Sequence, residues 1–280
     1  MKLAYCIVLP DSSVSLAAYR GSDLTATLED IAGLGYDGVE LFVRRPQRLD
    51  IKELKDVLKR TGLEVCGIGT APLVAQDHLT LTDPDENVRR RSIEWARELI
   101  DLAAEFGHGP VGIGKFRGQL PADNPVTGWQ WLKASLLEIC SYAESQDVLI
   151  ALEPQERRSI NNINSTWDGV KWLNQLGAPN ARLLLDTYHM ALEDESPAAG
   201  IFQAQNVLAH VHASDSGRTV PGQGSIDFAP IFKALQTIGF QGYLSVEIAQ
   251  PSEPSQALQA ARQAWEHLNE QLKALGPTIK

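Results

Sequence analysis

Short apolar runs alternate with longer amphipathic segments along most of the chain. The apolar runs are rich in β-branched residues and lack a regular polar alternation, which is typical of parallel strands buried on both faces. They predict strands at residues 3–9, 38–42, 64–70, 110–114, 148–153, 181–186, 207–212 and 243–248.

The segments between these runs have the spacing of amphipathic helices. They predict helices at about 24–34, 51–61, 84–106, 127–146, 166–176, 197–205, 228–238 and 254–275. Asp23 is a candidate N-cap for the first helix. A glycine ends several helices just before the next strand, as at the junction of two βα units: Gly35, Gly62, Gly107, Gly177 and Gly239.

Eight strands and eight helices in strict alternation predict a single (β/α)8 TIM barrel that spans residues 1–280 as one domain. The competing architecture is an open doubly wound sheet, which usually carries a glycine-rich phosphate turn after its first strand. Here the first strand leads into Pro10 and Asp11, and no GxGxxG motif follows. The stretch 117–126 is expected to be a loop on the face that carries active sites.

The composition narrows the class of protein. With 25 Lys and Arg against 35 Asp and Glu, the formal charge is −10, so we expect no nucleic acid and no anionic membrane as a partner. No segment approaches the roughly 20 apolar residues of a membrane span, and the first ten residues lack the long apolar region of a secretory signal. Three scattered cysteines, Cys6, Cys66 and Cys140, argue against a disulfide framework. We therefore expect a cytoplasmic protein.

Four consecutive strands end at or near a residue that could bind a metal ion: Glu153, Asp186, His212 and Glu247. The C-terminal ends of barrel strands lie side by side, so these side chains are expected to meet. Three carboxylates buried together would be costly without a cation. The pattern predicts one divalent metal, with Mn²⁺ favoured and Mg²⁺, Co²⁺ or Zn²⁺ tolerated.

Several motifs resemble those of one family. They are GYDGVE (35–40), ALEP (151–154), LDTYH (185–189), VHASDSGR (211–218), PGQGSIDF (221–228) and SVEI (245–248). Together they resemble the xylose-isomerase-like TIM-barrel sugar (phosphate) isomerase/epimerase family, nearest its ketose 3-epimerase and hydroxypyruvate isomerase branch. The resemblance covers nearly the whole chain. It is specific for the superfamily rather than for one reaction, because the same scaffold also carries dehydratases and an apurinic endonuclease branch.

The resemblance also assigns roles to residues. It implies that the four strand-end residues are the metal ligands, that His189 and Arg218 contact the substrate, and that Glu40 lies near the site. One position departs from the ketose epimerases, which usually have a second glutamate six residues after the glutamate of strand five. Here that position is Ser159, and Glu156 is a partial substitute at a different spacing.

Basic residues follow several of the predicted strands. If they all face the rim, they form a basic mouth and favour an anionic substrate, a phosphate or carboxylate held by arginine. The alternative is that several of them only pair with acidic residues around the rim. The basic residues are Arg44, Arg45, Lys115, Arg117, Arg157, Arg158 and Arg218. The candidate substrate contacts are His189, Arg218, Glu156, Arg157, Glu40 and Lys115.

A mechanism follows from a metal flanked by two glutamates. A chelated α-hydroxyketone loses a proton more readily, because the ion stabilises the resulting cis-enediolate. Glu153 and Glu247 are the expected acid/base pair, one removing the proton and the other returning it. Return on the opposite face gives epimerisation, return to the neighbouring carbon gives isomerisation, and loss of a β-hydroxyl gives dehydration. The sequence leaves these three outcomes open.

We therefore expect a metal-dependent isomerase or epimerase acting on a ketose or sugar-phosphate-like small molecule. The alternatives are a dehydratase of the inosose or dehydroshikimate type and a non-catalytic sugar-binding barrel. The nuclease branch is disfavoured because it needs many histidines, and several of the six here lie outside the strand ends: His78, His108 and His267. Self-association into a homo-oligomer is compatible with this class.

Overall fold

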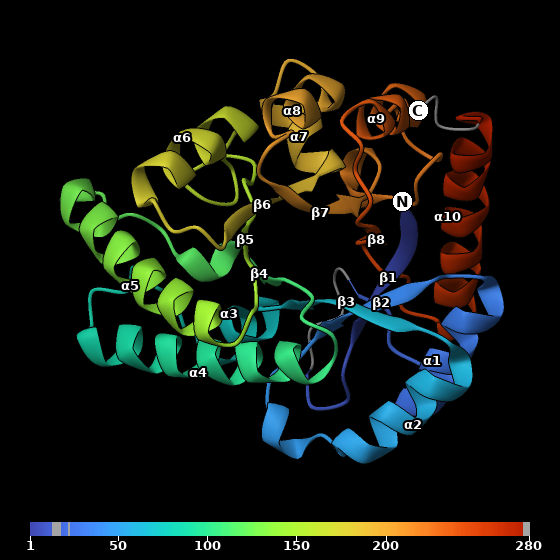
Figure 1. Ribbon diagram of the computed structural model, residues 1–280, viewed down its shortest axis with the longest axis horizontal. Coiled ribbons are helices and arrows are strands. Elements are labelled where there is room, and N and C mark those ends of the chain that lie inside the picture. The colour runs from blue at the N-terminus through green and yellow to red at the C-terminus, as the bar shows by residue number, and fades with distance from the viewer. Residues whose placement is uncertain (13–17, 22, 277–280) are drawn as a thin grey trace.

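The computed structural model describes residues 1–12, 18–21 and 23–276. Within this part of the chain, eight parallel strands close into a barrel in the order β1 to β8 (Figure 1). The predicted (β/α)8 barrel is confirmed. The strands are β1 (Lys2–Val8), β2 (Gly38–Phe42), β3 (Glu64–Gly69), β4 (Val111–Ile113), β5 (Ile150–Leu152), β6 (Ala181–Asp186), β7 (Leu208–Ala213) and β8 (Tyr243–Val246).

Helices surround the barrel, and every predicted helix is present with small changes at its ends (Figure 1). They are α1 (Leu24–Leu34), α2 (Ile51–Thr61), α4 (Glu86–Glu105), α5 (Pro125–Ser145), α6 (Thr166–Leu176), α8 (Pro197–Gln203), α9 (Phe228–Thr237) and α10 (Pro254–Ala274).

Several short elements were not predicted. They are α3 (Ala71–Asp77), α7 (Thr187–Glu193) and the 3-10 helices η1 (Pro46–Arg48), η2 (Lys115–Arg117) and η3 (Ser216–Arg218). Segments this short do not complete two helical turns, so periodicity cannot detect them. The helix α7 begins directly after β6, and the Asp186 side chain caps it by accepting from the Tyr188 amide at 2.8 Å.

Local signals set the ends of the longer helices. The Asp23 carboxylate accepts from the Ala26 amide at 2.6 Å, which confirms the predicted N-cap of α1. The helix α2 ends at Gly62, whose φ of 75° suits glycine. Among the described residues, no helix combines the length and the apolar character that a membrane crossing requires.

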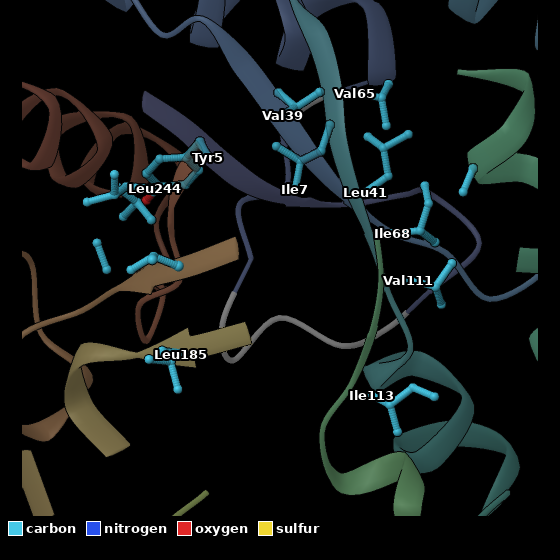
Figure 2. Packing of buried hydrophobic residues seen from close by; sticks show 14 of the residues in the cluster. Tyr5, Ile7, Val39, Leu41, Val65, Ile68, Val111, Ile113, Leu185 and Leu244 are labelled. Atoms are coloured by element: carbon cyan, nitrogen blue, oxygen red, sulfur yellow. The ribbon is translucent and has the colours of Figure 1, made fainter. Parts of the chain in front are cut away.

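Alternating side chains of the strands face opposite sides of the barrel wall. Tyr5 and Ile7 belong to the large apolar cluster shared by strands and helices, part of which Figure 2 shows. Cys6 and Val8 belong to a separate small cluster with Phe42. The wall thus packs outward on the helices, which leaves its inner face to carry polar side chains.

Candidate active site

The strand-end residues meet where the strands of the barrel end. Asp186 is the last residue of β6 and His212 lies in β7, while Glu153 and Glu247 directly follow β5 and β8. One nitrogen or oxygen atom from each lies within 4.8 Å of those of the other three. All four side chains belong to buried residues. The barrel therefore gathers three carboxylates and an imidazole from four separate strands.

Three atoms of this cluster are buried and have no hydrogen-bond partner among the described residues: Glu153 Oε1, Asp186 Oδ2 and His212 Nδ1. Asp186 Oδ2 has an ion-pair contact with Arg218, and the other two atoms face each other. They lie 3.5 Å apart, and His212 Nδ1 lies 3.4 Å from Glu247 Oε2. Buried polar atoms normally have partners, and a cation would supply the missing interactions. The set of oxygen and nitrogen donors fits a divalent metal.

The charges of the cluster favour a cation as well. Burial raises the pKa of Asp186, and Arg218 opposes this effect. Burial also disfavours ionisation of Glu247, but Arg218 and His212 outweigh it and lower the pKa of Glu247 below its usual range. In His212, burial disfavours the charged form, yet Glu40 and Glu247 raise its pKa well above the usual value. Positive charge is therefore stabilised among these carboxylates.

Glu40 lies behind His212, on the side away from the other carboxylates. Its Oε2 atom is 2.9 Å from His212 Nε2 and 3.0 Å from His210 Nε2, and only 2% of the residue is exposed. If Nε2 of a neutral His212 donates to Glu40, the lone pair of Nδ1 faces the cluster. These contacts hold His212 in place, and a contact of Glu40 with substrate stays a prediction. Sequence reasoning missed His210, although its i, i+2 spacing to His212 puts both on one face of β7.

His189 connects Arg218 to Glu156. Arg218 Nη2 donates to His189 Nε2 at 2.8 Å, since arginine can only donate. On the other side of the ring, Nδ1 contacts Glu156 Oε2 and lies 3.2 Å from the Glu156 amide, while the other carboxylate oxygen of Glu156 accepts from the Ser159 hydroxyl. Burial opposes ionisation of Glu156, but His189 and Ser159 lower its pKa to about 2. Glu156 and Ser159 together orient His189.

Several members of the predicted basic mouth pair with acidic residues of the protein, which is the alternative that the sequence left open. Arg157 Nη2 lies 2.6 Å from Glu193 Oε2, and 74% of the arginine side chain is exposed. Arg44 and Arg45 share Asp77, at 2.8 and 2.6 Å.

Two other cations of that group lack such partners. Lys115 and Arg158 are exposed, and neither forms an ion pair with the described residues.

Arg117, also expected at the mouth, is fully buried beneath the loop that follows β5. Its guanidinium donates to the carbonyls of Gly114 and Glu153 at 2.9 and 2.7 Å, and to those of Asn162 and Ile163 at 3.0 and 3.1 Å. Its Nε donates to Asn162 Oδ1 at 2.9 Å. Burial outweighs the attraction of Glu153 and lowers the pKa of Arg117 to about 10, so it stays charged at neutral pH. Arg117 therefore fixes the backbone around Glu153.

Asp215 has the corresponding place in the loop that follows β7. It is fully buried, and its carboxylate accepts from the amides of Ser216 and Ile226 at 2.7 and 2.9 Å and of Gly222 at 2.9 Å. This loop carries Arg218, whose φ of 61° is unusual for a residue with a side chain. No signal in the sequence distinguishes Asp215 from an exposed loop aspartate.

Gln155 supports Glu153 from the same loop. Its Nε2 donates to Glu153 Oε2 at 2.5 Å. A Cβ atom at Gly114 would lie 2.5 Å from this carboxylate oxygen and 2.7 Å from Gln155 Nε2. The glycine after β4 thus leaves the space that the pair occupies.

The sequence profile of a family described as "Xylose isomerase-like TIM barrel" matches residues 28–271. The chain belongs to this family. The match spans all the site residues described above and confirms the resemblance of the motifs.

Several similar proteins are sugar epimerases by name. L-ribulose 3-epimerase of Methylomonas sp. (strain DH-1) is 30% identical over 223 residues, which cover 77% of this chain and 75% of the relative. D-psicose 3-epimerase of Ruminiclostridium cellulolyticum is 28% identical over 234 residues, 81% of this chain and 78% of the relative. A solved structure of L-ribulose 3-epimerase superposes with a TM-score of 0.80 at 25% identity, over 100% of this chain and 99% of the other.

Proposed function

We propose that this protein is a divalent-metal-dependent sugar epimerase that inverts one carbon atom of a ketose. The observation that carries the proposal is the buried cluster of Glu153, Asp186, His212 and Glu247, in which Glu153 Oε1 and His212 Nδ1 lack hydrogen-bond partners among the described residues. The relatives named L-ribulose and D-psicose 3-epimerase support the ketose as substrate class.

The four residues would hold the ion through carboxylate oxygens and His212 Nδ1. Mostly oxygen donors with one imidazole favour Mn²⁺, with Mg²⁺, Co²⁺ or Zn²⁺ as substitutes. When bound, such an ion polarises the substrate carbonyl and stabilises the negative charge that develops as the neighbouring carbon loses its proton.

Glu153 and Glu247 are the proposed acid/base pair. They follow β5 and β8, so they approach the cluster from strands separated by β6 and β7. One glutamate, as the carboxylate, would remove the proton from the carbon next to the carbonyl, and the other, as the carboxylic acid, would return a proton to the opposite face. The result is inversion at that carbon. Each glutamate has its own hydrogen-bond donor, Gln155 for Glu153 and Arg218 for Glu247.

His189 and Arg218 are the proposed contacts to substrate oxygens. His189 is 3% exposed, and its Nε2 lies 3.9 Å from Glu153 Oε1, at the edge of the cluster. Glu156 and Ser159 hold the ring from the other side. Because the His189 side chain is already fixed, it can orient a substrate hydroxyl without losing conformational entropy on binding.

A neutral ketose fits the charges of the rim better than a sugar phosphate. Arg44, Arg45 and Arg157 are already paired with carboxylates of the protein, and Arg117 is buried. The preference for an anionic substrate that the basic residues suggested therefore loses most of its support.

The test is a reaction in D₂O with Mn²⁺ and a panel of neutral ketoses. We expect the C3 epimer with one deuterium at the inverted carbon, loss of activity with EDTA and recovery with Mn²⁺. Glu153→Gln and Glu247→Gln should each reduce kcat by about a hundredfold or more. An enone product that absorbs in the ultraviolet would contradict epimerisation and support a dehydratase. A higher kcat/KM for the phosphate of the same ketose would restore the anionic substrate.

A further inference from the structure

Arg218 contacts the oxygen atoms that a bound metal ion would use. Its Nη1 lies 2.8 Å from Asp186 Oδ2 and also donates to Glu247 Oε2. Glu247 Oε2 also lies 3.4 Å from His212 Nδ1. One nitrogen of the guanidinium thus bridges two carboxylates of the proposed metal centre.

Further contacts hold the guanidinium in this position. Nη2 lies 2.8 Å from His189 Nε2, and the Tyr188 ring lies 5.1 Å from the arginine Cζ. The Arg218 carbonyl accepts from the Ala249 amide at 2.8 Å, which ties its backbone to the segment after β8. Only 22% of the side chain is exposed, so solvent screens its charge weakly.

We propose that Arg218 is an internal counter-ion that competes with the divalent cation for Asp186 and Glu247. The inference rests on the metal centre proposed above. A cation that binds Asp186 Oδ2 and Glu247 Oε2 requires Nη1 to withdraw, because two positive groups cannot share these oxygens without repulsion. The released guanidinium then keeps Tyr188 and His189 as neighbours and is available to substrate oxygens.

Competition of this kind couples the two binding events. Metal binding would release the arginine for the substrate, and a substrate held by the arginine would in turn favour the metal, because coupling between sites is reciprocal. The carboxylates would also keep a positive partner whether or not the ion is bound, which limits the cost of burying them.

The experiment is a calorimetric titration of the full-length protein with Mn²⁺, comparing wild type, Arg218→Gln and Arg218→Lys. Loss of a charge-assisted contact to the ligands should tighten the Kd of Arg218→Gln for Mn²⁺ by about tenfold or more. Arg218→Lys keeps the charge but not the fork of donors, so its Kd for Mn²⁺ should lie between those of the wild type and Arg218→Gln. Arg158→Gln removes an exposed cation of another loop and should leave the Kd unchanged. Equal or weaker Mn²⁺ binding by Arg218→Gln would overturn the proposal.

Thermal unfolding gives a second readout that does not depend on activity. Without metal, Arg218→Gln should melt below the wild type, because Asp186 and Glu247 lose their cation. Saturating Mn²⁺ should raise its melting temperature more than that of the wild type. If Arg218→Gln does not fold, Arg218→Lys carries the same comparison, and an equal Mn²⁺-induced rise would again overturn the competition. Absence of Mn²⁺ binding to the wild type and to every variant would instead overturn the metal centre itself, and the inference with it.

Discussion

The loops after β5 and β7 are held by buried groups of opposite charge. In the loop after β5, the Arg117 guanidinium donates to a set of carbonyls that includes that of Glu153. In the loop after β7, the Asp215 carboxylate accepts from backbone amides on both sides of Arg218. Each loop carries a residue of the candidate site, and one buried charged side chain holds the backbone of each loop through hydrogen bonds.

The difference follows from which backbone groups each loop turns inward. Carbonyl groups directed into the protein need donors, and arginine supplies several from one planar group. Amides directed inward need acceptors, and a carboxylate offers two oxygens. The buried charge is stabilised in both cases by neutral backbone dipoles, so neither Arg117 nor Asp215 forms an ion pair with the residues proposed to bind metal. Because Arg117 makes more hydrogen bonds than Asp215, we expect replacement of Arg117 to destabilise the protein more.

Arg117→Met should have the largest effect. It removes the side-chain donor from the carbonyls of Glu153, Asn162 and Ile163, of which Ile163 keeps the Gln155 amide, and we expect the free energy of unfolding to fall by about 3–5 kcal/mol. Urea denaturation measures this change. Arg117→Lys keeps the charge but not the planar set of donors, so its free energy of unfolding should lie between those of the wild type and Arg117→Met. If Arg117→Met lowers the free energy of unfolding less than Asp215→Asn does, the expected order of the two groups is contradicted.

Asp215→Asn should have an intermediate effect. The amide places a donor where one oxygen accepted a backbone N–H, and we expect the free energy of unfolding to fall by about 1–2 kcal/mol. The kcat/KM for the ketose should fall as well, because Arg218 is less firmly held. The matched control is Asp227→Asn. Asp227 caps α9 by accepting from Ala229 N at 3.0 Å, and asparagine caps equally well. A kcat/KM equal to that of the wild type in Asp215→Asn would show that the loop positions Arg218 without the Asp215 carboxylate.

Two glycine substitutions, Gly217→Ala in the loop after β7 and Gly114→Ala after β4, should act by different mechanisms. Gly217 has a φ of 70° and open space around its missing Cβ, so Gly217→Ala should reduce stability by about 1 kcal/mol through the backbone alone. Gly217→Asn should lose less, because asparagine tolerates this conformation. Gly114 has an ordinary φ of −93°, but its Cβ would lie 2.5 Å from Glu153 Oε2. Gly114→Ala should therefore reduce kcat more than the melting temperature, and the opposite pattern would contradict this assignment.

Arg157→Gln should have the smallest effect. The Arg157 side chain is 74% exposed and pairs with Glu193, and exposed ion pairs contribute little. We expect the melting temperature and the kcat/KM for a neutral ketose to be unchanged within error. A fall in kcat/KM for the ketose phosphate alone would instead assign Arg157 to substrate binding.

Local features of the sequence predicted the architecture well. All eight strands and the longer helices follow from apolar periodicity, and the N-cap Asp23 and the glycine at 62 act through residues within one helical turn. The short helix α7 escaped detection because it completes too few turns. The convergence of Glu153, Asp186, His212 and Glu247 could be foreseen because closing the barrel places successive strand ends side by side.

The sequence by itself determined the order of elements, the closed barrel and the identity of the residues at the strand ends, since each depends on local pattern or on topology. Only the tertiary structure decided the partners of the charged side chains. Arg157 pairs with a residue 36 positions away, Arg117 bonds Asn162 at a separation of 45, and Glu40 reaches His212 across 172 residues. Such pairings depend on distances of a few ångströms between segments that are remote in the chain. For that reason the sequence could not show which of the basic residues pair with internal carboxylates, or that Glu40 contacts His212.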